Sequence, residues 1–485
     1  MGMKISLLTI LLFVAVKSYA NAPGVNTNLK VLSLSKNRMG DPGLVALMPA
    51  MMQAPNLETI NLGETGITPL GVQTVAPQLP NVMGLKTLDL SSNSIGNSGG
   101  IALGQNMPNI NVNLNIEGGN VGTPGVMSMF EGVAMNPRKS DFGVPNNPLG
   151  YDFAQQFSEF LKLDPDLKSV DLSGVEIKDA GLSMLAPSIG FNTVLEDINL
   201  SANLLTDRSI LVFFSALRSN IHLAVINLSM NNITNRSMAG IASFLSANSS
   251  LKELNLSGNT GITDPGALAL AGGLKYNLTL SKLDLTGCEI GPMGVNALHQ
   301  IMAMNPNIEI LMDGIPAAMP ETPPLPNFSM TNPYSDFSQL SQGMPSRKIG
   351  TIDFPSFNMP PQDFRMLLGM LQRYEIGALD FSGSQVPESA LSELAFQLPN
   401  LNVETLKLDN MKITDPAAAS IARALVANTT VKIIFLRQNS LTDLSAKAFA
   451  ELLKVNTQLE EIHMDGNRIT AMGAKLLSDA FASGN

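Results

Sequence analysis

The stretch "LKELNLSGNTGITDPG", residues 251–266, is one copy of a pattern that recurs along the whole chain. Each copy aligns as L-x-x-L-x-L-x-x-N-x-I and continues into a stretch with helical spacing. There are sixteen copies, and ten of the fifteen intervals between their first residues are 28 residues long. The copies begin at Leu29, Leu57, Leu85, Asn111, Lys139, Leu167, Leu195, Leu223, Leu251, Leu280, Ile308, Ile349, Ile376, Val403, Val431 and Leu459. A fixed period of this length indicates a protein of stacked repeats.

One copy predicts a short strand, a turn and a helix. Its fourth and sixth residues are apolar and alternate with polar ones, which is the period of a strand with one buried face. The Asn at the ninth position, as in Asn231, is expected to bond backbone groups that the turn leaves unpaired. The residues that follow, such as "TDPAAASIARALVAN" from Thr414, begin with helix-capping types. A single copy cannot bury its own apolar face, so the core must lie between stacked copies.

These residues closely resemble leucine-rich repeats of the ribonuclease-inhibitor type, and the resemblance covers residues 29–485. The resemblance implies an α/β fold, a leucine-rich-repeat solenoid or horseshoe with a parallel sheet on the concave face and helices on the convex face. Ribonuclease inhibitors, the sensor arms of NOD-like receptors, Ran GTPase-activating protein and many bacterial surface or injected proteins share this unit. The fold therefore does not choose among their functions.

The N-terminus predicts export. "MGMKISLLTILLFVAVKSYA" has Lys4, an apolar run over residues 5–16, and small residues at Ser18 and Ala20. This order is typical of a secretory signal peptide, which we place at residues 1–20. The apolar run is too short for a transmembrane helix. We expect a protein that is periplasmic, on the cell surface or extracellular, or delivered into a host cell, with no stable membrane span after signal cleavage.

A proline-rich stretch interrupts the repeat period. The interval from Ile308 to Ile349 is 41 residues long, and its excess lies in residues 315–331. This stretch predicts a loop that divides an N-terminal arc, residues 21–314, from a C-terminal arc, residues 332–485. Its "PETPPLP", residues 320–326, is stiff and extended by composition. It is either a docking peptide for a proline-binding module or a loop kept from fraying.

Composition limits the kind of ligand. The formal net charge of −10 argues against nucleic acid and favours a protein partner with a basic patch. The single cysteine, Cys288, excludes an internal disulfide framework and a Cys-cluster zinc site. In the Asn position of its copy, it is expected to be a buried turn residue. We find no candidate catalytic or metal-binding residues, and we expect no cofactor.

The concave face is the predicted partner-binding surface, since it carries the third, fifth and seventh residues of each copy. These columns hold twelve acids and three bases, which favours either a plain solvated face or an electronegative trough. In the C-terminal arc the fifth column changes to Lys407, Phe435 and His463, and Arg437 stands beside it in the seventh. The predicted site residues are Asp353, Asp380, Lys407, Asp409, Phe435, Arg437, His463 and Asp465. The alternative is an ordinary ion-pair ladder, with Phe435 covering the end of the solenoid.

These observations favour a non-enzymatic scaffold that binds a partner protein, in the manner of a bacterial secreted or host-directed effector. The alternative is a GTPase-activator-like regulator resembling Ran GTPase-activating protein. Members of that family usually carry a strongly acidic C-terminal tail, whereas this sequence ends in "AFASGN" directly after a helical stretch.

Overall fold

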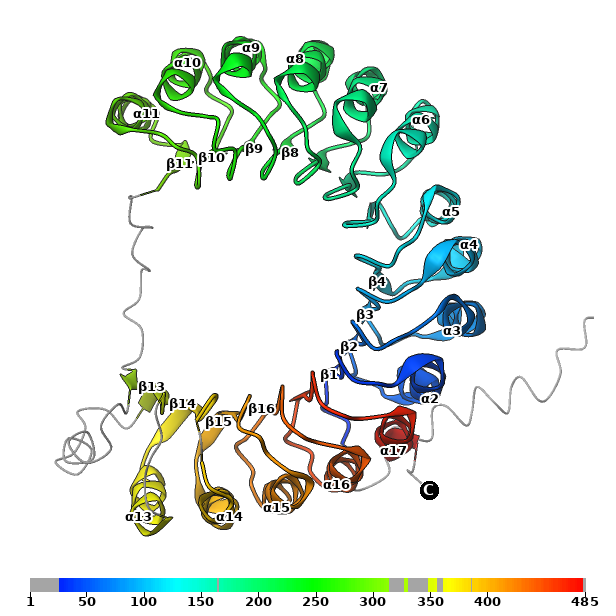
Figure 1. Cartoon of the computed structure of the whole chain (residues 1–485), viewed down its shortest axis with the longest axis vertical. Helices are drawn as coiled ribbons and strands as arrows, with labels where there is room; N and C mark the ends of the chain where they lie inside the picture. Colours follow the sequence, from blue (N-terminus) through cyan, green and yellow to red (C-terminus); the bar gives the residue numbers. More distant parts are fainter. Residues whose placement is uncertain are drawn as a thin grey trace, which may run out of the picture. The chain divides into compact units, whose positions relative to one another are not determined.

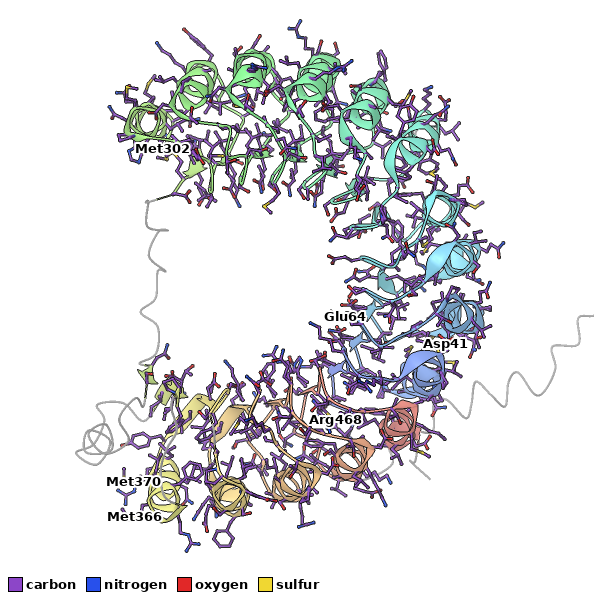
Figure 2. All side chains as sticks on the ribbon, in the orientation of Figure 1. Asp41, Glu64, Met302, Met366, Met370 and Arg468 are labelled. Carbon is purple, nitrogen blue, oxygen red and sulfur yellow. The ribbon has the colours of Figure 1, made fainter. Side chains whose placement is uncertain are left out.

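The computed structural model of the chain describes residues 26–163, 165–313, 327–329, 348–355, 361–384 and 386–482. In these residues short strands alternate with helices, and side chains fill the space between the strand layer and the helix layer (Figures 1 and 2). The described strands pair in parallel. The predicted α/β leucine-rich-repeat solenoid is therefore confirmed. The chain forms two compact units, which are described separately.

The first unit joins residues from both ends of the chain: Met1–Asn93, Val112–Leu114 and Pro320–Asn485. Its sheet has ten strands in the order β12-β13-β14-β15-β16-β17-β1-β2-β3-β4. The strands are β1 (Val31–Ser33), β2 (Thr59–Asn61), β3 (Thr87–Asp89), β4 (Asn113–Asn115), β12 (Phe328–Ser329), β13 (Lys348–Asp353), β14 (Glu375–Asp380), β15 (Val403–Lys407), β16 (Ile433–Phe435) and β17 (Glu461–His463). The helices are α2 (Gly40–Gln53), α3 (Pro69–Val75), η2 (Ala76–Asn81), α13 (Pro361–Leu371), α14 (Glu388–Gln397), η5 (Leu398–Asn400), α15 (Asp415–Leu425), α16 (Asp443–Leu453) and α17 (Ala471–Ala482).

The second unit contains Ser94–Asn111 and Asn115–Met319. Its seven-stranded sheet has the order β11-β10-β9-β8-β7-β6-β5. The strands are β5 (Asp141–Gly143), β6 (Ser169–Asp171), β7 (Asp197–Asn199), β8 (Val225–Asn227), β9 (Glu253–Asn255), β10 (Lys282–Asp284) and β11 (Glu309–Leu311). The helices are α4 (Gly96–Asn106), η3 (Met107–Asn109), α5 (Thr123–Ala134), α6 (Gly150–Leu161), α7 (Lys178–Phe191), α8 (Asp207–Ala216), η4 (Leu217–Ser219), α9 (Asn235–Ala247), α10 (Asp264–Leu274) and α11 (Pro292–Met304).

The first and last repeats stack on each other. Strand β17 pairs with β1, with His463 opposite Ser33, and α17 packs beside α2 (Figure 1). Leu32 and Ile462, the central residues of the two strands, are fully buried. Stacked repeats need their ends covered, and here each terminal repeat covers the other. We call this contact the terminal seam. The interpretation that Phe435 covers the end of the solenoid is wrong, because β16 is an interior strand.

A row of alternating charges crosses the terminal seam without interruption. It occupies the second position of the repeat on six neighbouring strands of the first unit: Glu404, Lys432, Glu460, Lys30, Glu58 and Lys86. Ion pairs join Lys432 to Glu404 at 2.9 Å, Lys30 to Glu460 at 2.5 Å, and Lys86 to Glu58 at 2.8 Å. Such exposed pairs add little stability, but like charges in adjacent strands would oppose pairing. The row therefore favours the order in which β17 precedes β1.

The ninth-position asparagines bond backbone groups as predicted. Asn231 Nδ2 donates to the carbonyls of Leu200 (3.1 Å) and Leu228 (3.0 Å), and its Oδ1 accepts the N–H groups of Asn203 and Leu205, both at 3.0 Å. Each such residue therefore joins its own turn to the preceding copy. The same bonds cross the terminal seam, where Asn37 Nδ2 donates to Met464 O at 3.0 Å and Asn37 Oδ1 accepts from Ile469 N at 2.9 Å. Cys288 is buried in this position, as expected, and its Sγ donates to Leu256 O at 3.4 Å.

A second row of asparagines, which was not predicted from the sequence, lies three residues before the start of the copies. Asn220 is representative: its Nδ2 donates to Ile189 O (3.1 Å) and Asn192 O (3.0 Å), and its Oδ1 accepts from His222 N (3.0 Å) and Leu223 N (2.8 Å). Bonds of this kind are made by Asn26, Asn136, Asn192, Asn220, Asn248, Asn277, Asn428 and Asn456. These residues fix the loop between each helix and the following strand.

The interruption of the period is described only in part. Of the predicted loop, residues 315–331, only 327–329 are described, and Phe328–Ser329 form β12, which pairs with β13. The proline-rich residues 320–326 and the signal peptide at residues 1–20 lie outside the described residues. The copy placed at Ile308 is displaced by one residue, because Glu309 rather than Ile310 aligns with Lys282. This register turns Ile310 and Met312 into the core, where both are buried.

Candidate functional site

The open face of each sheet, the face turned away from the helices, carries the polar columns of the repeat. Nine of the ten fifth-column Asn and Asp side chains accept the backbone N–H of the residue two positions further on through Oδ1. These nine are Asn61, Asp89, Asn115, Asp171, Asn199, Asn227, Asn255, Asp284 and Asp380. The bond forms an Asx turn at the end of the strand. The polarity of this column therefore follows from the scaffold and needs no ligand.

Four adjacent strands of the first unit, β15, β16, β17 and β1, depart from this rule. Their fifth-column residues are Lys407, Phe435, His463 and Ser33. We call these residues, with the seventh-column residues Asp409, Arg437, Asp465 and Ser35 of the same four copies, the four-strand patch.

The turns of the four-strand patch are held by the seventh column. Asp409 Oδ1 accepts the N–H of Arg437 at 2.7 Å, and Asp465 Oδ1 accepts the N–H of Ser35 at 2.9 Å. In both cases the carboxylate bonds the turn of the next copy rather than its own turn. The fifth-column side chains of these copies therefore do not form the Asx-turn bond that the fifth column forms elsewhere.

Phe435, Arg437 and His463 form a stack on the open face. The rings of Phe435 and His463 lie 4.4 Å apart between centroids with an interplanar angle of 13°. The guanidinium of Arg437 lies 4.8 Å from the centroid of Phe435. Arg437 also donates from Nε and Nη2 to Asp409 Oδ2, at 2.9 and 2.6 Å. The hydrogen bonds to Asp409 raise the pKa of Arg437 above its ordinary value. The stack presents a flat cation, an aromatic ring and an imidazole side by side.

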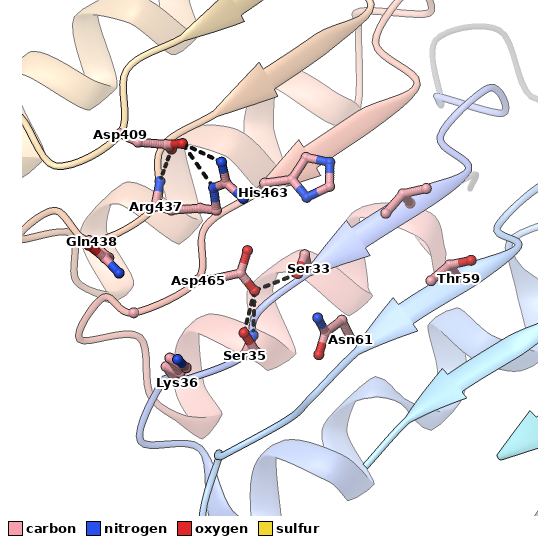
Figure 3. A pocket seen from close by; sticks show the side chains of 12 residues that line it. Ser33, Ser35, Lys36, Thr59, Asn61, Asp409, Arg437, Gln438, His463 and Asp465 are labelled. Carbon is pink, nitrogen blue, oxygen red and sulfur yellow. Dashed lines mark hydrogen bonds and ion pairs between the residues drawn. The ribbon is translucent and has the colours of Figure 1, made fainter. Parts of the chain in front are cut away.

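A hollow of about 560 Å³ adjoins this stack on the side of the first repeats (Figure 3). The last repeats contribute Asp409, Arg437, Gln438, His463 and Asp465 to its lining, and the first two repeats contribute Ser33, Ser35, Lys36, Thr59 and Asn61. Asp465 Oδ1 accepts from the Ser35 hydroxyl at 2.7 Å and from the Ser33 hydroxyl. The hollow therefore depends on the terminal seam, which brings the first and last repeats together.

The structure brings five of the eight predicted site residues into this region: Asp409, Phe435, Arg437, His463 and Asp465. Lys407, on β15, pairs with Asp380 at 3.5 Å and is not part of the lining of the hollow. Asp353 lies further along the sheet, on β13, where Ser329 Oγ donates to it at 3.0 Å. The part of all eight residues in partner binding remains a prediction.

Sequence reasoning missed the contribution of the first repeats. Ser33, Ser35, Lys36, Thr59 and Asn61 are more than 340 positions away from the five C-terminal site residues in the numbering, yet they line the same hollow. One signal was present, since Ser33 is a fifth-column residue that is neither Asn nor Asp, like Lys407, Phe435 and His463. It acquires meaning only when β1 follows β17.

The described residues offer no other evident chemistry. Among them, no group of three or more His, Cys, Asp or Glu side chains is placed to hold a metal ion. Burial raises the pKa of the Cys288 thiol to about 11, and such a thiol is a poor nucleophile at neutral pH. In the part of the chain that the structure describes, no helix is both long and apolar enough to cross a membrane.

Comparisons with known proteins agree with the fold. A family model described as "Leucine Rich repeat" matches residues 25–48, 85–104, 164–186, 219–242, 247–271 and 276–298. No curated protein matches the sequence.

Solved structures with similarity to the chain include actin-binding site 2 of leiomodin-1, with 22% identity, 31% of this chain and 88% of that chain covered, and a TM-score of 0.28. The tropomodulin C-terminal domain of Caenorhabditis elegans gives 15% identity, 32% and 92% coverage, and a TM-score of 0.28. The yeast complex of Rad7 and Elc1 gives 14% identity, 93% and 88% coverage, and a TM-score of 0.31. Likenesses this distant carry no argument about function.

Proposed function

We propose that this leucine-rich repeat protein is a non-enzymatic scaffold that binds a partner protein through the four-strand patch. One observation carries the proposal. On four adjacent strands the fifth-column side chains are released from the Asx turn, and there the chain places Lys407, Phe435 and His463 instead of Asn or Asp. The repeat fold does not require this change of residue type, whereas aromatic and arginine side chains are enriched at binding hot spots.

A partner with a basic patch fits the charges of this surface. Asp409 and Asp465 line the hollow, and Glu461 and Glu64 stand next to it, where they pair with His463 (3.0 Å) and Lys36 (3.3 Å). Only two side chains that line the hollow, Arg437 and Lys36, are permanently cationic. Together with Lys407 and Asp380, which pair at 3.5 Å on the adjoining strands, this surface carries five carboxylates and three permanent cations. Such an excess steers a basic surface toward the patch and disfavours an acidic one.

Export belongs to the same proposal. Residues 1–20 have the order of charge, apolar run and small residues that a signal peptide requires. A periplasmic, surface, extracellular or host-delivered scaffold, such as a bacterial effector, is consistent with that order. No specific observation favours the GTPase-activator-like alternative.

The test is affinity capture of a partner, followed by binding measurements with a double variant. The Phe435→Ala, Arg437→Ala chain removes the aromatic ring and its cation. Binding should fall at least tenfold while the melting temperature changes little, because both side chains lie on the open face.

The matched control is Thr87→Ala, Asp89→Asn on β3, which lies on the same sheet outside the four-strand patch and keeps the oxygen that accepts the Ser91 N–H. It should bind as the unchanged chain does. Equal binding by the unchanged chain and the Phe435→Ala, Arg437→Ala variant would remove the four-strand patch as the contact surface.

A further inference from the structure

One pair of neighbouring copies in the four-strand patch shows an arrangement of side chains that indicates what the hollow can bind. At β15 and β16, Asp409 takes the N–H of Arg437 on Oδ1 and the Arg437 guanidinium on Oδ2. The guanidinium also covers Phe435, two residues earlier on its own strand. A carboxylate, a guanidinium and a ring thus fill the space between neighbouring copies.

The same positions recur at the terminal seam with two side chains reduced. Asp465 stands where Asp409 does in its copy, and its Oδ1 takes the N–H of Ser35 in the same way. Ser35 stands in the position of Arg437, and Ser33 in the position of Phe435. Two small residues thus replace an arginine and a phenylalanine. The hollow of about 560 Å³ lies at the place they vacate.

The carboxylate of Asp465 is held in place by hydrogen bonds to one of its two oxygens. Three donors from the first repeat, the N–H and hydroxyl of Ser35 and the hydroxyl of Ser33, all reach Oδ1. Among the described residues, no hydrogen bond or ion pair reaches Oδ2, and Figure 3 shows this second oxygen turned away from both serines. Oδ2 is the atom that accepts the guanidinium in Asp409. A preorganised acceptor therefore stands beside an open space.

His463 supplies a flat surface next to that acceptor. One face of its ring is covered by Phe435 on β16. Because His463 lies between Phe435 and Ser33 in the register of the sheet, its other face is turned toward β1 and the hollow. A planar cation on this face would stack on the imidazole as Arg437 stacks on Phe435. Arginine suits such a place better than lysine, because its guanidinium is planar, stacks on rings and bonds carboxylates in a fixed geometry.

We propose that the hollow binds an arginine side chain of the partner protein, with its guanidinium on Asp465 Oδ2 and against the free face of His463. The proposal rests on the proposed function and names the anchor residue of the partner. The chain's own Asp409, Arg437 and Phe435 show the arrangement that the incoming side chain completes. The three donors to Oδ1 hold the carboxylate in place before the ligand arrives, so binding costs little reorganisation.

The first test uses three fluorescein-labelled peptides that differ at one residue, Gly-Ser-X-Ser-Gly with X as arginine, citrulline or lysine. Citrulline keeps the shape of arginine and removes its charge. The arginine peptide should bind the purified chain at least tenfold more tightly than the citrulline peptide, with the lysine peptide between them. Equal binding of the arginine and citrulline peptides would overturn the proposal.

Two variants assign that preference to the hollow. Asp465→Asn keeps an oxygen for Ser33 and Ser35 but removes the negative charge, so it should reduce binding of the arginine peptide to the citrulline level. Asp89→Asn, the same change at an Asx turn on β3, should leave binding unchanged. If Asp465→Asn keeps the preference for arginine, the guanidinium binds elsewhere and the proposal fails.

A third variant separates occupation of the hollow from damage to it. Ser35→Arg restores the template by placing the chain's own guanidinium within reach of Asp465. It should abolish binding of the arginine peptide without lowering the melting temperature, and unchanged peptide binding would contradict the proposal. Against a captured partner, Ser35→Arg and Phe435→Ala, Arg437→Ala give separate answers. If only the second weakens binding, the proposed function holds and the arginine anchor is wrong. If neither does, the proposed function fails as well.

Discussion

At the level of single residues, one asparagine side chain bonds the backbone of two adjacent copies. Asn231 bonds the carbonyls of Leu200 and Leu228 and the N–H groups of Asn203 and Leu205. Each of these groups is buried, so none can turn to water if its partner is lost. The cost of removing such a side chain is the desolvation of the groups left behind rather than the value of one bond.

Asn231→Ala should therefore lower the free energy of unfolding by about 3 kcal/mol or more. Asn199→Ala is the matched control, because Asn199 lies on the open face of β7 and makes the single Asx-turn bond to Ser201 N. The control should lose about 1 kcal/mol. Urea denaturation followed by circular dichroism measures both. Similar losses for the two variants would show that the buried row does not hold the copies together.

Cys288 gives a second prediction at this scale. Burial raises the pKa of its thiol to about 11, against an ordinary value of 9.0. Because the thiolate is the reactive form, the rate of alkylation by iodoacetamide should rise about tenfold per pH unit between about pH 8 and 10 in the folded chain. In the unfolded chain the rate should level off near the ordinary value. A folded-state rate that also levels off there would contradict the burial of this thiol.

At the scale of the element, neighbouring helices are joined at their N-termini by carboxylates. Asp415, the first residue of α15, accepts the N–H and the hydroxyl of Thr442 at 2.8 and 2.7 Å and also bonds Ser445 at the start of α16. Burial alone would raise the pKa of Asp415, but the hydrogen bonds from Ser445 and Thr442 outweigh it and lower that pKa below its ordinary value of 3.8. The same arrangement lowers the pKa of Asp179, which bonds Thr206 and Ser209.

The lowered pKa of Asp415 determines how its contribution to the free energy of unfolding changes with pH. A carboxyl group with a lower pKa in the folded state stabilises the fold fully above its unfolded pKa, and this contribution is lost as the pH falls through the folded pKa. Asp415→Ala should therefore cost about 1–2 kcal/mol at neutral pH. Its difference from the unchanged chain should shrink as the pH falls below 3.8. Denaturation curves at neutral and acidic pH give both values, and a difference that stays constant with pH would exclude this role.

The order of strands and helices could largely be predicted from the sequence, because the period of the repeat places each strand. The alternation of leucines predicts strands centred on residues such as Leu254 and Ile434, and both are buried strand centres. The Asn row before each strand, the Asx turns and the Asp bonds between helices were not identified, although all recur with the same period. These features are hydrogen bonds of polar side chains, and the spacing of apolar residues contains no information about them.

For the whole chain, the pairing of the first repeat with the last could not be predicted from the period of the repeat alone. Consecutive elements usually lie side by side, so the first and last copies are expected to be the ends of a stack. Only side-chain identities contradict this expectation. The alternating row from Glu404 to Lys86 continues its order from Glu460 to Lys30. The departure of the fifth column from Asn and Asp likewise runs through His463 to Ser33. Neither signal can be recognised before the two copies are placed together.

The four-strand patch and its hollow depend on the terminal seam. Val31 and Glu461 face each other in register on β1 and β17. Adjacent strands lie about 4.8 Å apart, within the range that a disulfide spans. The most direct measurement is oxidation of the Val31→Cys, Glu461→Cys chain, followed by gel electrophoresis without reductant and mass spectrometry of the linked peptides.

We expect a disulfide within one chain between residues 31 and 461, formed by a monomer. The control, Thr87→Cys with Glu461→Cys, places one cysteine on β3, three strands from β17, and should form no such bond. Failure of the first pair to oxidise, or its appearance only as a bond between two chains, would contradict the terminal seam and the binding site built on it.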